Sequence, residues 1–96
     1  MMVVVAYDVN TETPEGRKRL RAVAKISAKY GQRVQNSVFE CEVSPSDYLM
    51  LVHDLVEVMD QERDSLRMYK LGAKHSSKIE QFGRRRHLPV DDVMLI

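Results

Sequence analysis

Cysteine, tryptophan, proline and glycine are scarce in this chain of 96 residues, which holds one, none, three and four of them, respectively. The single cysteine, Cys41, excludes an intramolecular disulfide and a cysteine-based metal site. Because Cys41 alternates with Phe39 and Val43, we expect it in the core rather than as a reactive thiol. No linker, internal repeat or low-complexity segment divides the sequence, so we expect one domain spanning residues 1–96.

A long apolar run is also missing. No stretch approaches the ~20 consecutive apolar residues of a membrane-spanning helix. The apolar segment 1–6 is shorter than a signal-peptide core and has no basic leader. We therefore expect a cytoplasmic protein with no membrane partner, and the small size of the chain favours burial of further surface in a dimer.

Several well-known catalytic motifs are absent as well. There is no phosphate-binding GxxxxGK loop, no dinucleotide fingerprint and no HExxH metal motif. The histidines His53, His75 and His87 are scattered over polar positions, where surface roles are expected. Ser37 has no evident base nearby, so a serine nucleophile is not indicated. Aromatic residues do not interleave with the basic ones, which argues against stacking of single-stranded bases.

Charge is nearly balanced overall but segregated along the chain. The net charge is +1, which by itself predicts no polyanionic partner. Seven basic and three acidic residues lie between Asp8 and Arg33, one basic and eight acidic between Glu40 and Asp64, and seven basic and three acidic from Ser65 onward. If this segregation persists in space, one surface is basic and another acidic.

Alternating and β-branched runs predict five strands. They span residues 2–8, 32–35, 38–43, 64–71 and 77–82. The first is apolar almost throughout and is expected to be buried on both faces. The third points Phe39, Cys41 and Val43 inward, and a tight turn at Asn36–Ser37 joins it to the second.

Two helices separate these strands. Thr13–Pro14 favours the start of the first helix, and Gly31 can end it in the left-handed conformation, while Ser44 favours the start of the second. The first helix has an apolar face formed by Leu20, Val23, Ala24 and Ser27 and a basic stripe formed by Lys18, Arg21, Lys25 and Lys29. The second has a broad apolar face formed by Tyr48, Leu51, Val52, Leu55, Val56 and Met59. The stripe predicts either a phosphate-binding surface for a duplex or a solvated helix face.

The order of elements is strand, helix, strand, strand, helix, strand, followed by one more piece. This is the α+β, ferredoxin-like βαββαβ pattern: a four-stranded antiparallel sheet with two helices on one face. The other face must be solvated or covered by a partner. The apolar end of the chain suggests an extra C-terminal strand, with residues 77–96 packing on a partner subunit.

Asp8 is the one ionisable group that the pattern places on a rigid element, at the end of the first strand. Its alternative role is to begin a turn or cap the polar loop that follows. One aspartate makes a poor Mg²⁺ site, because the ion prefers octahedral oxygen ligation. A two-fold dimer would let two copies of Asp8 converge on one Mg²⁺ or Mn²⁺ ion, with basic side chains holding a phosphodiester beside it.

Three segments together resemble the CRISPR-associated protein two family, the small partner in CRISPR spacer acquisition. They are Val4-Val5-Ala6-Tyr7-Asp8-Val9, Arg19-Leu20-Arg21 and the continuous run from Tyr30 to Glu40. The run from Arg33 to Glu40, at the right distance behind Asp8, is the specific part. The segment 64–72 looks like the branch that accompanies subtype I-C systems.

The resemblance implies a ferredoxin-like homodimer that acts as a metal-dependent endonuclease on single-stranded RNA or double-stranded DNA and bridges dimers of the CRISPR integrase. Asp8 would be the catalytic and metal-binding residue. The expected nucleic-acid contacts, combining the family motifs with the basic stripe, are Tyr7, Arg17, Lys18, Arg19, Arg21, Arg33, Ser37 and Phe39. The cluster Arg84–Arg86 matches no motif of the family, and either contacts nucleic acid or forms a solvated loop.

Three hypotheses follow from the sequence. The first is a dimeric adaptation protein with Mg²⁺-dependent phosphodiesterase activity at Asp8. The second is a structural bridge that holds duplex DNA by its Lys and Arg side chains, without chemistry at Asp8. The third sets the resemblance aside and assumes a ferredoxin-like regulatory or toxin-type ribonuclease dimer.

Overall fold

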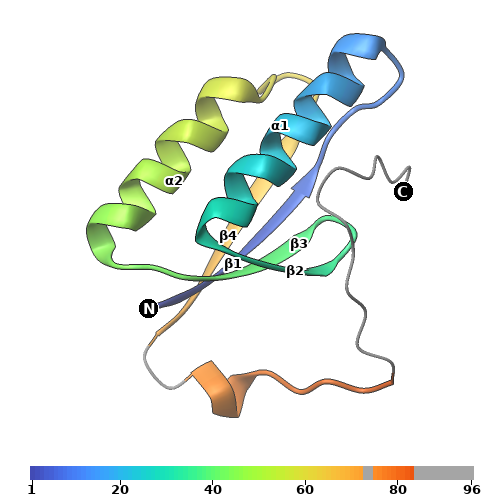
Figure 1. Ribbon diagram of the computed structural model, residues 1–96. Coiled ribbons are helices and arrows are strands. Elements are labelled where there is room, and N and C mark those ends of the chain that lie inside the picture. The colour runs from blue at the N-terminus through green and yellow to red at the C-terminus, as the bar shows by residue number, and fades with distance from the viewer. Residues whose placement is uncertain (73–74, 84–96) are drawn as a thin grey trace.

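Two helices lie side by side on one face of a four-stranded antiparallel sheet (Figure 1). The structure is a computed structural model whose described residues are 1–72 and 75–83. In chain order the elements are β1 Met2–Asp8, α1 Pro14–Tyr30, β2 Gly31–Gln35, β3 Val38–Glu42, α2 Pro45–Val58, β4 Ser65–Gly72 and a 3₁₀ turn at His75–Lys78. The strand order is β2-β3-β1-β4, and β1 pairs antiparallel with both neighbours. The predicted ferredoxin-like βαββαβ order is confirmed.

Strand β1 is buried on one face, not on both. Val3, Val5 and Tyr7 are buried, whereas Val4 and Ala6 between them are half-buried. The prediction of burial on both faces was wrong, because both helices cover the same side of the sheet. The uncovered side, here called the open face, presents Met2, Val4, Ala6 and Asp8 from β1, Val38, Glu40 and Glu42 from β3, and Arg67 and Tyr69 from β4.

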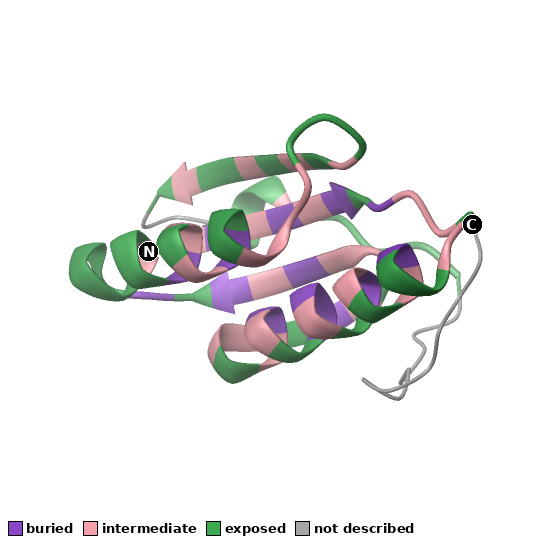
Figure 2. Ribbon diagram, turned by 90° about the horizontal axis from the view of Figure 1, so that it is seen from above, coloured by how far each residue is buried: buried purple, intermediate pink, exposed green. Residues whose placement is uncertain are grey.

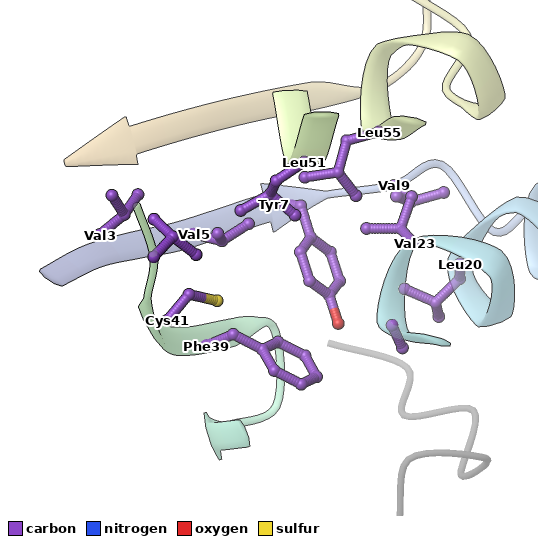
Figure 3. Packing of buried hydrophobic residues seen from close by; sticks show 12 residues of the cluster. Val3, Val5, Tyr7, Val9, Leu20, Val23, Phe39, Cys41, Leu51 and Leu55 are labelled. Carbon is purple, nitrogen blue, oxygen red and sulfur yellow. The ribbon is translucent and has the colours of Figure 1, made fainter. Parts of the chain in front are cut away.

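The core fills the space between the helices and the sheet. Figure 2 shows its buried segments in β1 and β3 beneath the helices, and Figure 3 shows the side chains that interdigitate there. The predicted inward residues Phe39, Cys41 and Val43 are confirmed as buried. On α2 the predicted apolar face was wrong at one position. Val56, which was predicted to lie on that face, is 37% exposed, whereas Val58 packs against the core.

The predicted helix starts are confirmed. The Thr13 hydroxyl accepts a hydrogen bond from the Gly16 amide at 3.0 Å, and the Ser44 hydroxyl accepts one from the Asp47 amide at 3.2 Å. Gly16 is required for another reason. A Cβ there would lie 1.9 Å from the Asn10 carbonyl oxygen, so the loop after β1 can rest directly on the first turn of α1.

The predicted left-handed cap at Gly31 was wrong. Its φ of −165° is extended, and β2 begins at this residue without an intervening loop. Glycine is favoured there by close packing of the hairpin, because a Cβ would lie 2.2 Å from the Glu40 carbonyl oxygen. The chain therefore passes from helix to strand in a single step.

The strand predicted at 77–82 was also wrong as far as the structure describes it. Residues 75–78 form the 3₁₀ turn, and residues 79–83 have no regular secondary structure. A strand needs a neighbouring strand for its hydrogen bonds, and residues 79–83 are not paired with any of the four strands that the structure describes. The predicted apolar strand end and Arg84–Arg86 lie outside the described residues. Within the described ranges, no helix is both long enough and apolar enough to span a membrane.

Candidate functional site

Asp8 occupies the last position of β1 and is exposed. The side chains on either side of it, Tyr7 and Val9, are buried in the core. Because side chains alternate along a strand, these two anchors point Asp8 away from the helices, onto the open face. Within residues 1–72 and 75–83, no hydrogen bond or ion pair engages the Asp8 carboxylate.

Two neighbouring segments frame this strand end. On one side, Ser65 of β4 lies directly opposite Asp8 in the antiparallel register. On the other side, the carbonyl of Ser37 accepts a hydrogen bond from the Tyr7 amide at 3.1 Å, which brings the β2–β3 turn alongside. Of the residues predicted from the sequence, the structure thus brings Ser37, which is half-buried, next to the Asp8 strand end.

Tyr7, Arg33 and Phe39 form a separate, buried group on the helix-covered side of the sheet. Their exposed fractions are 6%, 5% and 0%. The rings of Tyr7 and Phe39 stack with centroids 6.3 Å apart, and the Arg33 guanidinium carbon lies 5.5 Å from the centre of the Phe39 ring. Figure 3 shows Tyr7 and Phe39 projecting to the same side from neighbouring strands. In this fold these three side chains are core residues, and the expectation that they contact nucleic acid stays a prediction.

Burial also sets the chemistry of the ionisable groups in this core. Burial raises the pKa of Tyr7, and the nearby Arg33 guanidinium offsets part of that rise. Burial raises the pKa of the Cys41 thiol to about 11, so the thiolate needed for nucleophilic or metal-binding chemistry is not accessible at neutral pH.

Arg17 and Arg19, at the start of α1, are both engaged within the protein. A terminal nitrogen of Arg17 donates to the Thr11 carbonyl at 3.1 Å. Arg19 donates from Nε to one oxygen of Asp64 at 2.9 Å and from Nη2 to the other at 3.3 Å. The Arg19 guanidinium already binds a carboxylate in the fork geometry that arginine favours. Contact of Arg19 with nucleic acid would therefore compete with this ion pair.

Asp64 is the residue that sequence reasoning missed. Its side chain is 1% exposed, yet it carries a charge. Burial alone would raise its pKa, but hydrogen bonds from Arg19, Asp60 and Asn10 outweigh burial and hold the pKa below its ordinary value. No local motif predicts this pairing, because Arg19 and Asp64 are 45 residues apart in the chain.

The basic stripe of α1 is present as predicted. Lys18, Arg21, Lys25 and Lys29 are all exposed, on the side of the helix away from the core. They recur every three or four residues over about three turns, so they align along one helix face. A row of exposed cations of this kind suits a phosphate backbone better than an individual base.

Among the described residues, the Asp8 carboxylate is a candidate ligand for a divalent cation. No group of three or more His, Cys, Asp or Glu side chains suited to a metal occurs in the part of the chain that is described. The exposed, unengaged carboxylate of Asp8 is a hard oxygen ligand, and Mg²⁺ is commonly held by one or two carboxylates together with waters and substrate phosphates. Asp8 could therefore contribute one such ligand, with a second copy supplying the other.

Comparison with known proteins gives consistent matches. The family model described as "CRISPR associated protein Cas2" matches residues 1–79. The "CRISPR-associated endoribonuclease Cas2" of Chlorobaculum tepidum is 46% identical over 100% of both chains. The "CRISPR-associated endonuclease Cas2" of Halalkalibacterium halodurans is 44% identical over 99% of both. The crystal structure of Streptococcus pyogenes Cas2 at pH 6.5 is 55% identical with a TM-score of 0.78, over 86% of this chain and 100% of that one.

Proposed function

The chain belongs to the Cas2 family. We propose that it is a cytoplasmic, homodimeric CRISPR adaptation protein with metal-dependent endonuclease activity at Asp8. The carrying observation is the exposed, unengaged Asp8 carboxylate held by two buried neighbours at a strand end. The names of the relatives, endoribonuclease and endonuclease, support phosphodiester cleavage. The word endoribonuclease points to RNA, and the word endonuclease leaves the nucleic acid open. The substrate that we propose is single-stranded RNA or double-stranded DNA.

The open face supports a dimer. It combines half-buried apolar side chains such as Val4, Ala6 and Val38 with the charged Glu40 and Arg67. A two-fold axis passing near the end of β1 would bring two copies of Asp8 together. In this arrangement, we propose, residues 77–96 pack on the partner subunit, since the described part of that segment finds no strand to pair with in its own chain.

The residues of the chain divide the catalytic work by position. Asp8 would hold the metal, Mg²⁺ or Mn²⁺, and the ion would supply stabilisation of phosphate charge and a more acidic water. Ser65 and the Ser37 turn border the strand end where the scissile phosphate would lie. Lys18 and Arg21 on α1 hold flanking phosphates by charge. The buried Tyr7 and Phe39 keep the strand end in register and do not touch the substrate.

A second function is supported by a different observation, the exposed basic stripe. Four cations along α1 would hold duplex DNA by counterion release whether or not Asp8 carries out chemistry. In this alternative the dimer is a structural bridge between dimers of the CRISPR integrase. Both functions use the same surfaces, and they differ in whether Asp8 is needed.

The test is cleavage of labelled duplex DNA and single-stranded RNA by the purified protein with Mg²⁺ or Mn²⁺. We expect Asp8→Asn to lower the cleavage rate about a hundredfold or more, because it removes the metal ligand, with an unchanged melting temperature. Glu57→Gln, which removes an exposed acid on α2, is the matched control and should cleave normally. Equal cleavage by Asp8→Asn and wild type would reject the nuclease. Normal spacer uptake in cells carrying Asp8→Asn would favour the bridge.

A further inference from the structure

The buried carboxylate of Asp64 uses all of its hydrogen-bonding capacity. One oxygen accepts from the Asn10 amide at 3.0 Å and from Arg19 Nη2 at 3.3 Å. The other accepts from Arg19 Nε and from the Asp60 amide, both at 2.9 Å. A carboxylate offers about four acceptor positions, so this cluster of Asp64, Arg19, Asn10 and Asp60, here called the Asp64 clamp, is saturated.

The clamp completes a closed circuit of covalent and hydrogen-bonded contacts that includes Asp8. Asn10 follows Asp8 by two residues, and its amide is bound to Asp64. Ser65 follows Asp64 directly and is the strand partner of Asp8. The chain from Asp8 to Asn10, the hydrogen bond to Asp64, and the pairing of Ser65 back to Asp8 therefore form one closed circuit. Because the strand end is part of this circuit, its backbone has little freedom to shift.

The clamp also joins this circuit to both helices. Arg19 belongs to α1, and its side chain is 18% exposed. Asp60 lies just beyond the end of α2. Three segments that meet at the end of β1 thus converge on one carboxylate, and the contacts lie at the edge of the core rather than on the open face. The clamp can therefore act on Asp8 only through the backbone of the strand end, since none of its hydrogen bonds reaches the Asp8 carboxylate.

We propose that Asp64, held by Arg19, is a positioning residue for Asp8, and that Arg19 acts on the site through this ion pair rather than by touching nucleic acid. The inference rests on the proposed function of Asp8. Replacement of Asp64 by Asn cannot preserve the clamp. The amide NH₂ of Asn would face N–H donors on whichever side it points, leaving two of the four hydrogen bonds unmade.

The first experiment measures Mn²⁺ affinity and cleavage kinetics of full-length Asp64→Asn and Arg19→Lys. We expect Asp64→Asn to weaken Mn²⁺ binding by up to about tenfold, the lower end of the cost of losing a group bonded directly to a ligand, because Asp64 acts on Asp8 only through the backbone. Saturating Mn²⁺ should restore much of kcat, while KM for nucleic acid stays unchanged. Arg19→Lys keeps the charge but loses the fork, so a smaller loss in the same direction is expected. Arg19→Lys also keeps the test valid if Asp64→Asn folds poorly.

Two matched controls separate positioning from general destabilisation. Glu62→Gln removes an exposed acid from the same turn and should leave Mn²⁺ affinity unchanged. Lys25→Met removes a cation from the stripe and should raise KM and weaken the salt dependence of binding, without changing Mn²⁺ affinity. A purely structural Asp64 would lower activity in proportion to the folded fraction, and the folded molecules would bind Mn²⁺ normally. That result would overturn the proposal.

The second experiment follows the backbone amide signals of Asp8 and Asn10 by NMR without metal. Asp64→Asn should shift the Asp8 signal and speed hydrogen exchange at Asn10, and an unmoved Asp8 signal would refute the positioning role. This readout does not depend on chemistry. If Asp8→Asn leaves Mn²⁺ affinity unchanged, the proposed function fails, whereas the NMR result still decides whether the clamp holds the strand end.

Discussion

The predicted site residues that lie on strands are divided between the two faces of the sheet, although neighbouring residues of β1 supply both faces. The helix-covered face takes Tyr7, Arg33 and Phe39, stacked and almost wholly buried. The open face takes Asp8, exposed and unengaged in the described chain. Family motifs that run together in the sequence therefore separate in space into a structural part and a chemical part. Substitutions should affect stability on one face and activity or assembly on the other.

The largest effect is expected on the covered face. Phe39→Ala removes a fully buried ring from the core and the partner of the Arg33 guanidinium. We expect a loss of about 3–5 kcal/mol in the free energy of unfolding, measured by urea denaturation. For the molecules that stay folded, cleavage per molecule should fall far less than in Asp8→Asn. A Phe39→Ala protein of normal stability would show that the covered face is not the structural one.

A smaller effect is expected on the open face. Val4 is half-buried there, opposite Glu40 on one side and Tyr69 on the other. We expect Val4→Glu to raise the dissociation constant of the dimer at least tenfold, or about 1.4 kcal/mol, because it places a charge in the proposed interface. Sedimentation velocity measures the change. Val56→Glu on α2 is the control, and a similar response from both would place the interface elsewhere.

The smallest effect concerns the acid side of the pH range. The pKa of Asp64 is lowered in the folded protein, so the folded state binds a proton less readily than the unfolded chain. The stabilisation is fully present above the unfolded value of about 3.9 and is lost as pH falls through the folded pKa. We expect wild type and Asp64→Asn to differ in urea midpoint at pH 6, and the gap to narrow progressively as the pH falls below about 4. A gap that stays constant as the pH is lowered through this range would contradict the charged clamp.

The fold could be predicted from the sequence wherever the signal involves only a few neighbouring residues. The capping residues Thr13 and Ser44 and the turn at Asn36–Ser37 act over a few residues, so their pattern is visible in one dimension. The burial of only one face of β1 could not be predicted in this way, because a run of β-branched residues has the same sequence pattern whether one or both of its faces are covered. Asp8 was found by its position at a strand end, which is again a local signal.

The surroundings of two site residues could not be predicted from the sequence. Arg33 and Arg19 were expected to contact nucleic acid because they match the family motifs. Arg33 is instead buried against an aromatic ring, and Arg19 is paired with a carboxylate 45 residues away. The Arg19–Asp64 pair leaves no spacing to detect in a single sequence, and it forms only when the start of β4 is placed beside the end of β1. The Arg33–Phe39 contact follows from the register of the β2–β3 hairpin.

The direct junction between α1 and β2 at Gly31 limits the insertions and deletions that proteins of this family can tolerate. With no loop between α1 and β2, an inserted or deleted residue late in the helix would rotate its earlier part by about 100° relative to the sheet. The lysines and arginines along its outer side would then turn toward neighbouring elements. Natural variation in length should therefore avoid the segment leading into Gly31.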